Sequence, residues 1–154
     1  MSKENIKVIA RNRRARHDYH IFETFEAGIV LRGSEVKSLR DGKASLAEAY
    51  ARVRDGEAFL IGAYIKPYEH TGSYDQLDPR RDRKLLLHKR QIRDLERQTR
   101  IKGNTLIPLS LYFRDGYAKV EIGIGTGKKK YDKRQDMKER DARREMVRAM
   151  KKFK

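Results

Sequence analysis

Alternation of apolar and polar residues is clearest near the start of the last third of the chain. Every second residue is apolar on both sides of Asp115-Gly116: Ile107, Leu109, Leu111 and Phe113 before the pair, and Ala118, Val120, Ile122 and Ile124 after it. Successive side chains of a strand point to opposite faces, so this pattern predicts two strands, each with one buried face. Asp-Gly favours the positive φ angles of tight hairpin turns, so the two strands should pair.

A second hairpin is predicted around Asp55-Gly56. Small apolar residues alternate with polar ones over 47–53, and residues 57–65 follow the turn. Upstream, 17–22 and 25–31 are rich in aromatic and β-branched residues, which predicts two more strands. The spacing of the hairpins predicts a small closed antiparallel barrel, so the expected fold class is mainly β with short helices.

Two helices should interrupt the strands. Ser34 can cap a helix that runs to Leu39, with Glu35 at its positively polarised start. Residues 88–101 form the second, with a basic stripe on one face, either solvated or facing phosphates: Lys89, Arg93, Arg97 and Arg100. The segment 70–83 reads as a loop, and the basic run at 80–84 as solvated charge or phosphate contacts.

Charge indicates the class of partner. The 154 residues contain 38 Lys and Arg against 22 Asp and Glu, a net charge of +16. This excess predicts an anionic polymer as partner, most simply nucleic acid. No run approaches the roughly 18 apolar residues of a membrane span, and no secretory leader is evident, so we expect a cytoplasmic protein without membrane contact.

The charge is unevenly distributed. Residues 127–154 hold 13 basic and 5 acidic residues, whereas 1–126 hold 25 and 17. Each part therefore has a net charge of +8, but the tail is far shorter. Its few apolar residues bury too little surface to offset the entropy of ordering. We therefore divide the chain into a barrel domain, 1–126, and a basic tail, 127–154.

Catalytic and metal sites are not predicted. The chain has no Cys, and His17-Asp18-Tyr19-His20, if on a strand, spreads its ligands over both faces. The stretch 123–128 lacks the first Gly and the final Ser or Thr of a phosphate-binding P-loop. Gly123 and Gly125 should lie on the outer strand face, marking a bulge, a bend or a close backbone approach. We expect no enzymatic activity, metal or cofactor.

Basic residues interleaved with aromatic ones favour RNA. Five basic side chains precede Tyr19 and Phe22: Lys7, Arg11, Arg13, Arg14 and Arg16. Cations and flat rings together hold RNA phosphates and unstacked bases. A ribosomal or general RNA-binding barrel and an RNA-processing nuclease are the alternatives, although no catalytic set supports the nuclease.

Several stretches together resemble the SsrA-binding protein (small protein B) family, in the family's order and over nearly the whole chain. They are Asn12-Arg-Arg-Ala-Arg-His-Asp-Tyr19, Phe25-Glu-Ala-Gly-Ile-Val-Leu31, Gly33-Ser-Glu-Val-Lys-Ser-Leu-Arg40, Asp55-Gly-Glu-Ala-Phe59, Lys84-Leu-Leu-Leu87, Gly127-Lys-Lys-Lys-Tyr-Asp-Lys-Arg134 and Asp136-Met-Lys-Glu-Arg140.

The resemblance implies an oligonucleotide-binding-like barrel that binds the tRNA-like domain of transfer-messenger RNA. It also implies delivery of that RNA to stalled ribosomes, where the protein stands in for the missing codon–anticodon pair. The tail would be disordered when free and form a helix in the empty mRNA path beside the small-subunit decoding centre. DNA is not an expected partner.

The matched motifs also imply site residues. The implied RNA contacts are Asn12, Arg13, Arg16, His17, Glu26, Lys84, Leu86 and His88. The implied ribosome contacts are Tyr131, Asp132, Lys133, Arg134 and Lys138. Many relatives have Asn at the position of His88 and His at the position of Tyr131. Both Tyr and His are flat, so stacking on a base survives the second change.

Overall fold

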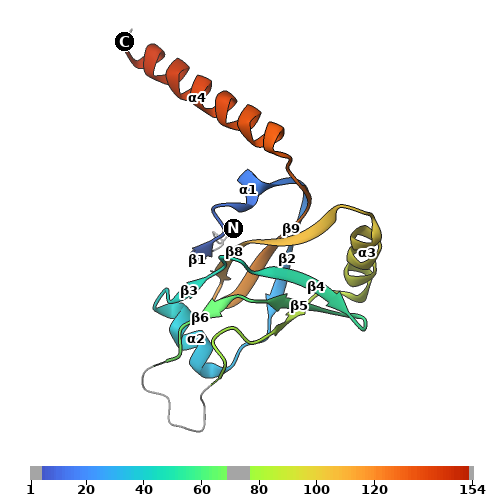
Figure 1. Ribbon diagram of the computed structural model, residues 1–154. Coiled ribbons are helices and arrows are strands. Elements are labelled where there is room, and N and C mark those ends of the chain that lie inside the picture. Colours follow the sequence, from blue (N-terminus) through green and yellow to red (C-terminus); the bar gives the residue numbers. More distant parts are fainter. Residues whose placement is uncertain (1–4, 69–76, 153–154) are drawn as a thin grey trace.

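The computed structural model describes residues 5–68 and 77–152 (Figure 1). An antiparallel β-barrel carries small helices on its surface, and a long helix extends from it. The elements are β1 (Ile6–Arg11), α1 (Ala15–Asp18), β2 (Tyr19–Ile29), α2 (Gly33–Arg40), β3 (Ala44–Ser45), β4 (Tyr50–Arg54), β5 (Glu57–Ile61), β6 (Tyr64–Ile65), β7 (Arg83–Leu86), α3 (Lys89–Arg100), β8 (Asn104–Arg114), β9 (Tyr117–Gly127) and α4 (Lys130–Lys152).

Six antiparallel strands form a closed ring. The order is β8-β4-β5-β7-β2-β9, and β9 pairs back with β8. β1 adds a further strand to β8, while β3 and β6 pair separately. Closure leaves few free strand edges and encloses one main core. The predicted barrel is thus confirmed.

Both predicted hairpin turns are present. Asp55 and Gly56 have φ angles of 52° and 74°, and Asp115 and Gly116 have 49° and 85°. Two consecutive positive φ angles suit the twist of paired strands. The alternation before the first turn begins later than predicted, because Ala47 lies in a turn ahead of β4.

The predicted single apolar face of β8 is wrong. Pro108 pairs with Ile122 and Ser110 with Glu121, so Leu109 is an extra residue in the strand. Such a bulge exchanges the two faces of a strand. Leu111 and Phe113 therefore join the main core, whereas Ile107 and Leu109 join a second cluster around Ala15. The inner face of β9 is confirmed, with Val120, Ile122 and Ile124 in the main core.

The two strands predicted at 17–22 and 25–31 are one strand, β2, because both halves pair with β9. A bulge at Phe22 absorbs the interruption in the pattern. The strand starts at Tyr19, so the prediction that His17 and Asp18 are extended is also wrong, and both lie in α1.

The outer-face glycines of β9 mark a close approach of β2, which is one of the three readings that the sequence left open. A Cβ on Gly125 would lie 2.4 Å from the carbonyl oxygen of His20 on β2, and one on Gly123 would lie 2.9 Å from Cγ2 of Ile21. Both residues pair within the β2–β9 ladder. The glycines therefore let β2 lie closely on β9 at its bulge.

The helices differ from the prediction mainly at their starts. α2 begins at Gly33, so Ser34 is inside the helix and does not cap it. Glu35 instead accepts a hydrogen bond from the backbone N–H of Arg32, at 2.9 Å. α3 matches the predicted second helix and buries Leu95 in the main core. The two helices lie on different sides of the barrel (Figure 1).

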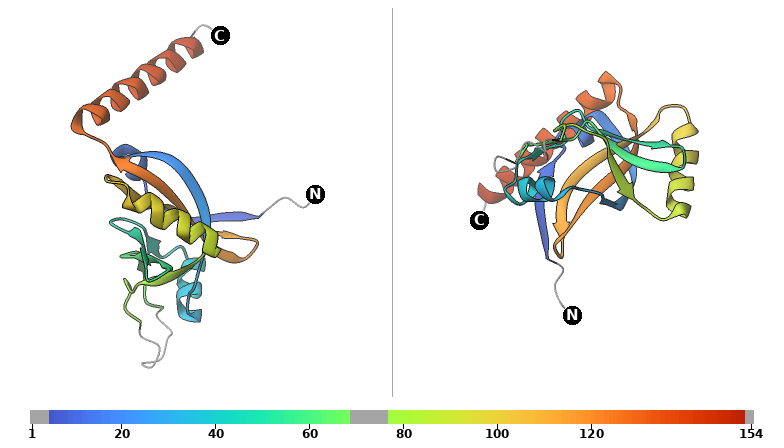
Figure 2. Two further views of the ribbon diagram at one scale, coloured as in Figure 1. Left: turned by 90° about the vertical axis from the view of Figure 1, so that its right-hand side faces the viewer. Right: turned by 90° about the horizontal axis from the view of Figure 1, so that it is seen from below.

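The tail is helical from Lys130 to Lys152 in this structure. β9 ends at Gly127, next to the predicted domain boundary. In Figure 1 and in the left view of Figure 2, α4 extends away from the barrel, starting beside α1. Among residues 5–68 and 77–152, none of the helices combines the length and the apolar composition of a membrane span.

Candidate nucleic-acid interface

The outer surface of five neighbouring strands forms one continuous face. Cross-strand partners in antiparallel sheets point to the same side. The register places one such row across the sheet, from β1 through β8, β9 and β2 to β7: Val8, Tyr112, Lys119, Gly28 and Leu86. Leu86 is 54% exposed although it is apolar. A Cβ on Gly28 would lie 3.2 Å from Cβ of Leu86, so the glycine leaves room for that side chain.

Glu26 lies next to this row and is held by two side chains of β8. Tyr112 Oη donates a hydrogen bond to Glu26 Oε2, and Arg114 Nε lies 2.9 Å from the same oxygen. Burial by itself would raise the pKa of Glu26, but the hydrogen bonds from Tyr112 and Arg114 outweigh it and lower that pKa. Burial and the bond to Glu26 raise the pKa of Tyr112 to about 12. The result is an ionised carboxylate that is fixed in place and still partly exposed.

A hollow of about 430 Å³ adjoins the Glu26 cluster. Tyr112 and Arg114 form part of its wall, and three predicted RNA contacts, Asn12, Arg13 and Arg16, form another. Asn12 is fixed to β8, since its Nδ2 donates to the carbonyl of Pro108 at 3.1 Å and its backbone N–H to that of Leu109 at 2.8 Å. Arg13 and Arg16 are exposed. The structure thus places these basic residues beside the acidic contact.

The other predicted RNA contacts lie around the same face. Lys84 shares the outer side of β7 with Leu86, and its Nζ lies 3.0 Å from Glu57 Oε1. His88 is exposed just before α3, where its backbone N–H donates to Gln91 Oε1 at 3.0 Å. His17 is turned toward its neighbour in α1, with Nδ1 3.0 Å from Asp18 Oδ1. The contact of His17 thus lies within α1 and not on the strand face.

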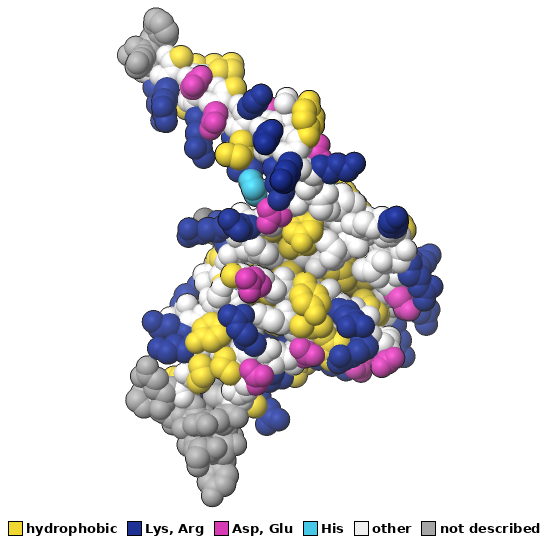
Figure 3. All heavy atoms as spheres, in the orientation of Figure 1, with side chains coloured by type: hydrophobic (Ala, Val, Ile, Leu, Met, Phe, Trp, Pro, Cys, Tyr) yellow, Lys and Arg dark blue, Asp and Glu magenta, His cyan; other side chains and the backbone are white. Residues whose placement is uncertain are grey.

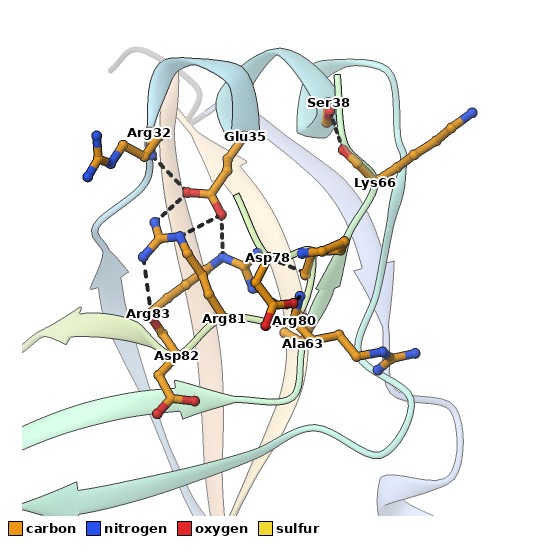
Figure 4. Close-up of polar contacts among 11 residues, drawn as sticks. Arg32, Glu35, Ser38, Ala63, Lys66, Asp78, Arg80, Arg81, Asp82 and Arg83 are labelled. Carbon is orange, nitrogen blue, oxygen red and sulfur yellow. Dashed lines mark hydrogen bonds and ion pairs between the residues drawn. The ribbon is translucent and has the colours of Figure 1, made fainter. Parts of the chain in front are cut away.

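Neither reading of the basic run at 80–84 fits Arg81 and Arg83, because both bind Glu35 inside the protein (Figure 4). Arg80 is exposed. Arg83 Nε lies 2.7 Å from Glu35 Oε2, and Arg81 pairs with both carboxylate oxygens. Arg83 is 1% exposed and also donates to the carbonyls of Ala63 and Pro79. Arg81 and Arg83 thus form a structural clamp on Glu35 of α2. Residues 70–76 of the predicted loop lie outside the described part.

Burial and hydrogen bonding act in opposite directions on the pKa values of Glu35 and Arg83. Burial by itself would raise the pKa of Glu35, but hydrogen bonds from Arg81, the Arg32 backbone and Arg83 lower it. Burial likewise lowers the pKa of Arg83, opposed by its bonds to Glu35. Glu35 thus stays ionised as the counter-ion of two guanidinium groups.

The predicted ribosome contacts lie on the first turns of α4. Tyr131 is 75% exposed, and Arg134 and Lys138 are also exposed. Asp132 Oδ2 accepts from the backbone N–H of Lys129 at 3.3 Å, so Asp132 stabilises the start of α4 from within its first turn. Lys133 Nζ lies 3.2 Å from Asp18 Oδ1. Basic side chains follow α4 along the face seen in Figure 3.

The basic stripe on α3 is exposed at all four positions, and two of its arginines pair within the helix. Arg97 pairs with Asp94, and Arg100 Nη2 lies 2.9 Å from Glu96 Oε1. These pairs fit the solvated reading, and the phosphate-facing reading stays untested.

Two residues of the interface were missed by the sequence reasoning. Tyr112 and Arg114 hold Glu26 from a strand 86 and 88 positions away. The sequence pattern contained part of this information. Both residues alternate with Leu111 and Phe113, which are buried, and so belong to the outer face. The acidic residue that they contact is set by the register of β8, β9 and β2, which the sequence alone does not give.

A metal site is also not seen among residues 5–68 and 77–152, where no group of three or more His, Asp and Glu side chains is arranged to hold an ion. His20 Nε2 instead lies 3.4 Å from Asp132 Oδ2, at the base of the tail.

Comparison with known proteins points to one family. The family model described as SmpB protein matches residues 9–152. An SsrA-binding protein of Geobacillus thermodenitrificans is 54% identical over 149 residues, which cover 97% of this chain and 96% of the relative. One of Listeria welshimeri is 53% identical over 151 residues, covering 98% and 97%. A solved structure described as "tmRNA-SmpB: a journey to the center of the bacterial ribosome" has a chain 57% identical, with a TM-score of 0.65, covering 78% of this chain and 84% of that one.

Proposed function

The chain belongs to the SmpB protein family, and we infer from this that it binds transfer-messenger RNA and acts in trans-translation on the ribosome. It is an RNA-binding protein, and the recognition of RNA needs no catalytic group. We further propose that the barrel binds the tRNA-like domain. The tail engages the decoding centre and the mRNA path of the ribosome. Such a function belongs in the cytoplasm, where ribosomes work.

The observation that carries the barrel's part is the exposed face beside Glu26. An ionised carboxylate accepts hydrogen bonds from a ribose 2′-OH or a base amino group, and an exposed Leu packs on a base or sugar. Arg13 and Arg16, across the adjoining hollow, supply phosphate contacts. RNA selectivity thus comes from Glu26 and Leu86, and much of the affinity from the arginines.

Leu86→Ala tests this assignment with a matched control. Ile101 is as exposed as Leu86, at 55% against 54%, but lies at the end of α3. We expect Leu86→Ala to weaken binding of the tRNA-like domain about tenfold or more, since burying a leucine side chain contributes roughly 1.5–3 kcal/mol. Ile101→Ala should leave affinity unchanged. Equal effects of the two changes on a gel-shift titration would contradict the proposed face.

The tail has a separate role in the proposal. Tyr131 stacks on an exposed ribosomal base, while Lys133 and Arg134 meet flanking phosphates. Replacing all three with Ala should leave affinity for transfer-messenger RNA within a few fold and abolish peptide tagging on stalled ribosomes. Tyr117→Ala, at a site 73% exposed on the barrel, is the control and should tag normally. Parallel loss of RNA binding and tagging would disprove this division of labour.

The alternatives predict different partners and products. A general RNA-binding barrel would retain many RNAs when isolated from cells, whereas the proposed protein retains mainly transfer-messenger RNA. A nuclease would shorten the bound RNA in a metal-dependent way, and we expect the RNA to remain intact. Sequencing the RNA that copurifies, with its end positions, decides both points.

A further inference from the structure

The base of α4 is tied to α1 by a cluster of charged contacts. Lys128 donates from its backbone to the carbonyl of Asp18 at 2.8 Å, and from Nζ to the carbonyl of Arg16 at 2.8 Å. The same Nζ pairs with Asp136, in the second turn of α4. Lys133 Nζ, in the first turn, pairs with Asp18 Oδ1 at 3.2 Å. These contacts involve both helices and the linker between β9 and α4.

We propose that Asp18, Lys128, Lys133 and Asp136 form a latch that fixes the first two turns of α4 on α1 in the free protein. The tail then has two parts: a root, residues 128–136, held in a fixed direction, and a distal segment beyond it that moves independently. This inference rests on contacts within the chain and does not require the proposed ribosome contacts. The sequence predicted a mobile tail over residues 127–154. The latch reduces the mobile part to the residues beyond Asp136.

Charge and burial support the latch. The side chain of Lys128 is only 7% exposed, which is unusual for a lysine, and its ammonium group is satisfied by a carboxylate and a carbonyl. The hydrogen bond from His17, followed by that from Lys133, lowers the pKa of Asp18. The hydrogen bond from Lys128 likewise lowers the pKa of Asp136. Both acids are thus ionised at neutral pH and able to hold their lysines.

Beyond Asp136 the helix has no such support. Residues 137–151 are all exposed, including Met137, Met146 and Met150. An isolated helix of this length is marginal in water, so the distal segment should unfold and refold freely. The boundary between the two parts is therefore set by the last contact with the barrel.

The latch joins the tail to a helix that also carries proposed RNA contacts. α1 carries Arg16 and His17, which belong to the proposed RNA contacts, and Asp18, which holds the tail. A root fixed on α1 keeps the direction of the tail constant relative to RNA bound on the barrel.

Distances between spin labels test the latch directly, because the chain contains no Cys. One label is placed at Lys102→Cys on the barrel, and the second at either Gln135→Cys in the root or Met146→Cys in the distal segment. We expect a narrow distance distribution for 102–135 and a broad one for 102–146. A 102–135 distribution as broad as that of 102–146 would overturn the proposal.

Charge changes identify the contacts responsible. Asp18→Asn combined with Asp136→Asn should broaden the 102–135 distribution, whereas Asp141→Asn, in the distal segment, should not. Asp18→Lys alone should broaden it as well, and adding Lys133→Asp should narrow it again by restoring an ion pair of reversed polarity. An unchanged root in the double Asn variant, or a failure of the swap to restore it, would exclude the latch.

Discussion

Glu35 shows how one residue can be essential for structure while lying in a motif shared with an RNA-binding family. Its side chain is 6% exposed and is the counter-ion of Arg83, which is buried still more completely. Removing one partner of a buried ion pair leaves the other charge without compensation in a poorly polarisable interior. Replacing Glu35 alone should therefore reduce stability by more than the ion pair as a whole contributes to it.

We expect Glu35→Gln to lower the free energy of unfolding by roughly 3–5 kcal/mol, measured by denaturant titration. Glu57→Gln is the control, because Glu57 forms an exposed pair with Lys84 that should contribute less than about 1 kcal/mol. Similar losses in the two variants would show that burial of the clamp does not set its strength.

Lowering the pH should weaken the same clamp. The pKa of Glu35 is lowered on folding, so its contribution to stability is complete above the unfolded value of 4.5 and is lost as pH falls through the folded value. The wild-type protein should therefore lose more stability than Glu35→Gln when unfolding is measured at decreasing pH below 4.5. Parallel curves for the two proteins would contradict this assignment.

Gly125 illustrates a constraint that belongs to a pair of strands. β9 lies so close to β2 that a methyl group on Gly125 meets the backbone of His20, which cannot turn away as a side chain would. Gly127, two positions later in the same strand, has no atom within 4 Å of its Cβ position. The need for glycine thus comes from the packing of β2.

Gly125→Ala should lower the melting temperature by several degrees, since overpacking costs about 1–3 kcal/mol. Gly127→Ala is expected to change it little. Calorimetry on both variants tests the point, and equal melting temperatures would mean that β2 moves aside without cost.

The charge of the whole molecule should appear as salt dependence of RNA binding. With a net charge of +16, binding releases counterions from RNA, so affinity for the tRNA-like domain should fall steeply with salt. Arg13→Ala and Arg16→Ala should each reduce the slope of log affinity against log salt by about one. Leu86→Ala should weaken binding without changing the slope, because it removes no charge. A slope unaffected by both arginine changes would place their side chains away from phosphates.

Sequence alone determined the features that depend on neighbours along the chain. Alternation gave the inner face of β9, Asp-Gly pairs gave both hairpin turns, and hairpin spacing gave the barrel. Charge density predicted a separate tail, and the ordered motifs indicated the family. Each of these signals is local, or is a sum over many positions, and so survives without knowledge of the fold.

Tertiary structure decided what depends on register and on partners far apart in sequence. One extra residue at Leu109 exchanged the faces of β8, an effect that no period-two pattern reveals. Pairing of β7 with β2 and β5 turned Leu86 outward and brought Arg83 to Glu35, so an apolar residue became surface and a basic one became core. The side that a residue faces is set by the strand beside it, and that strand can come from anywhere in the chain.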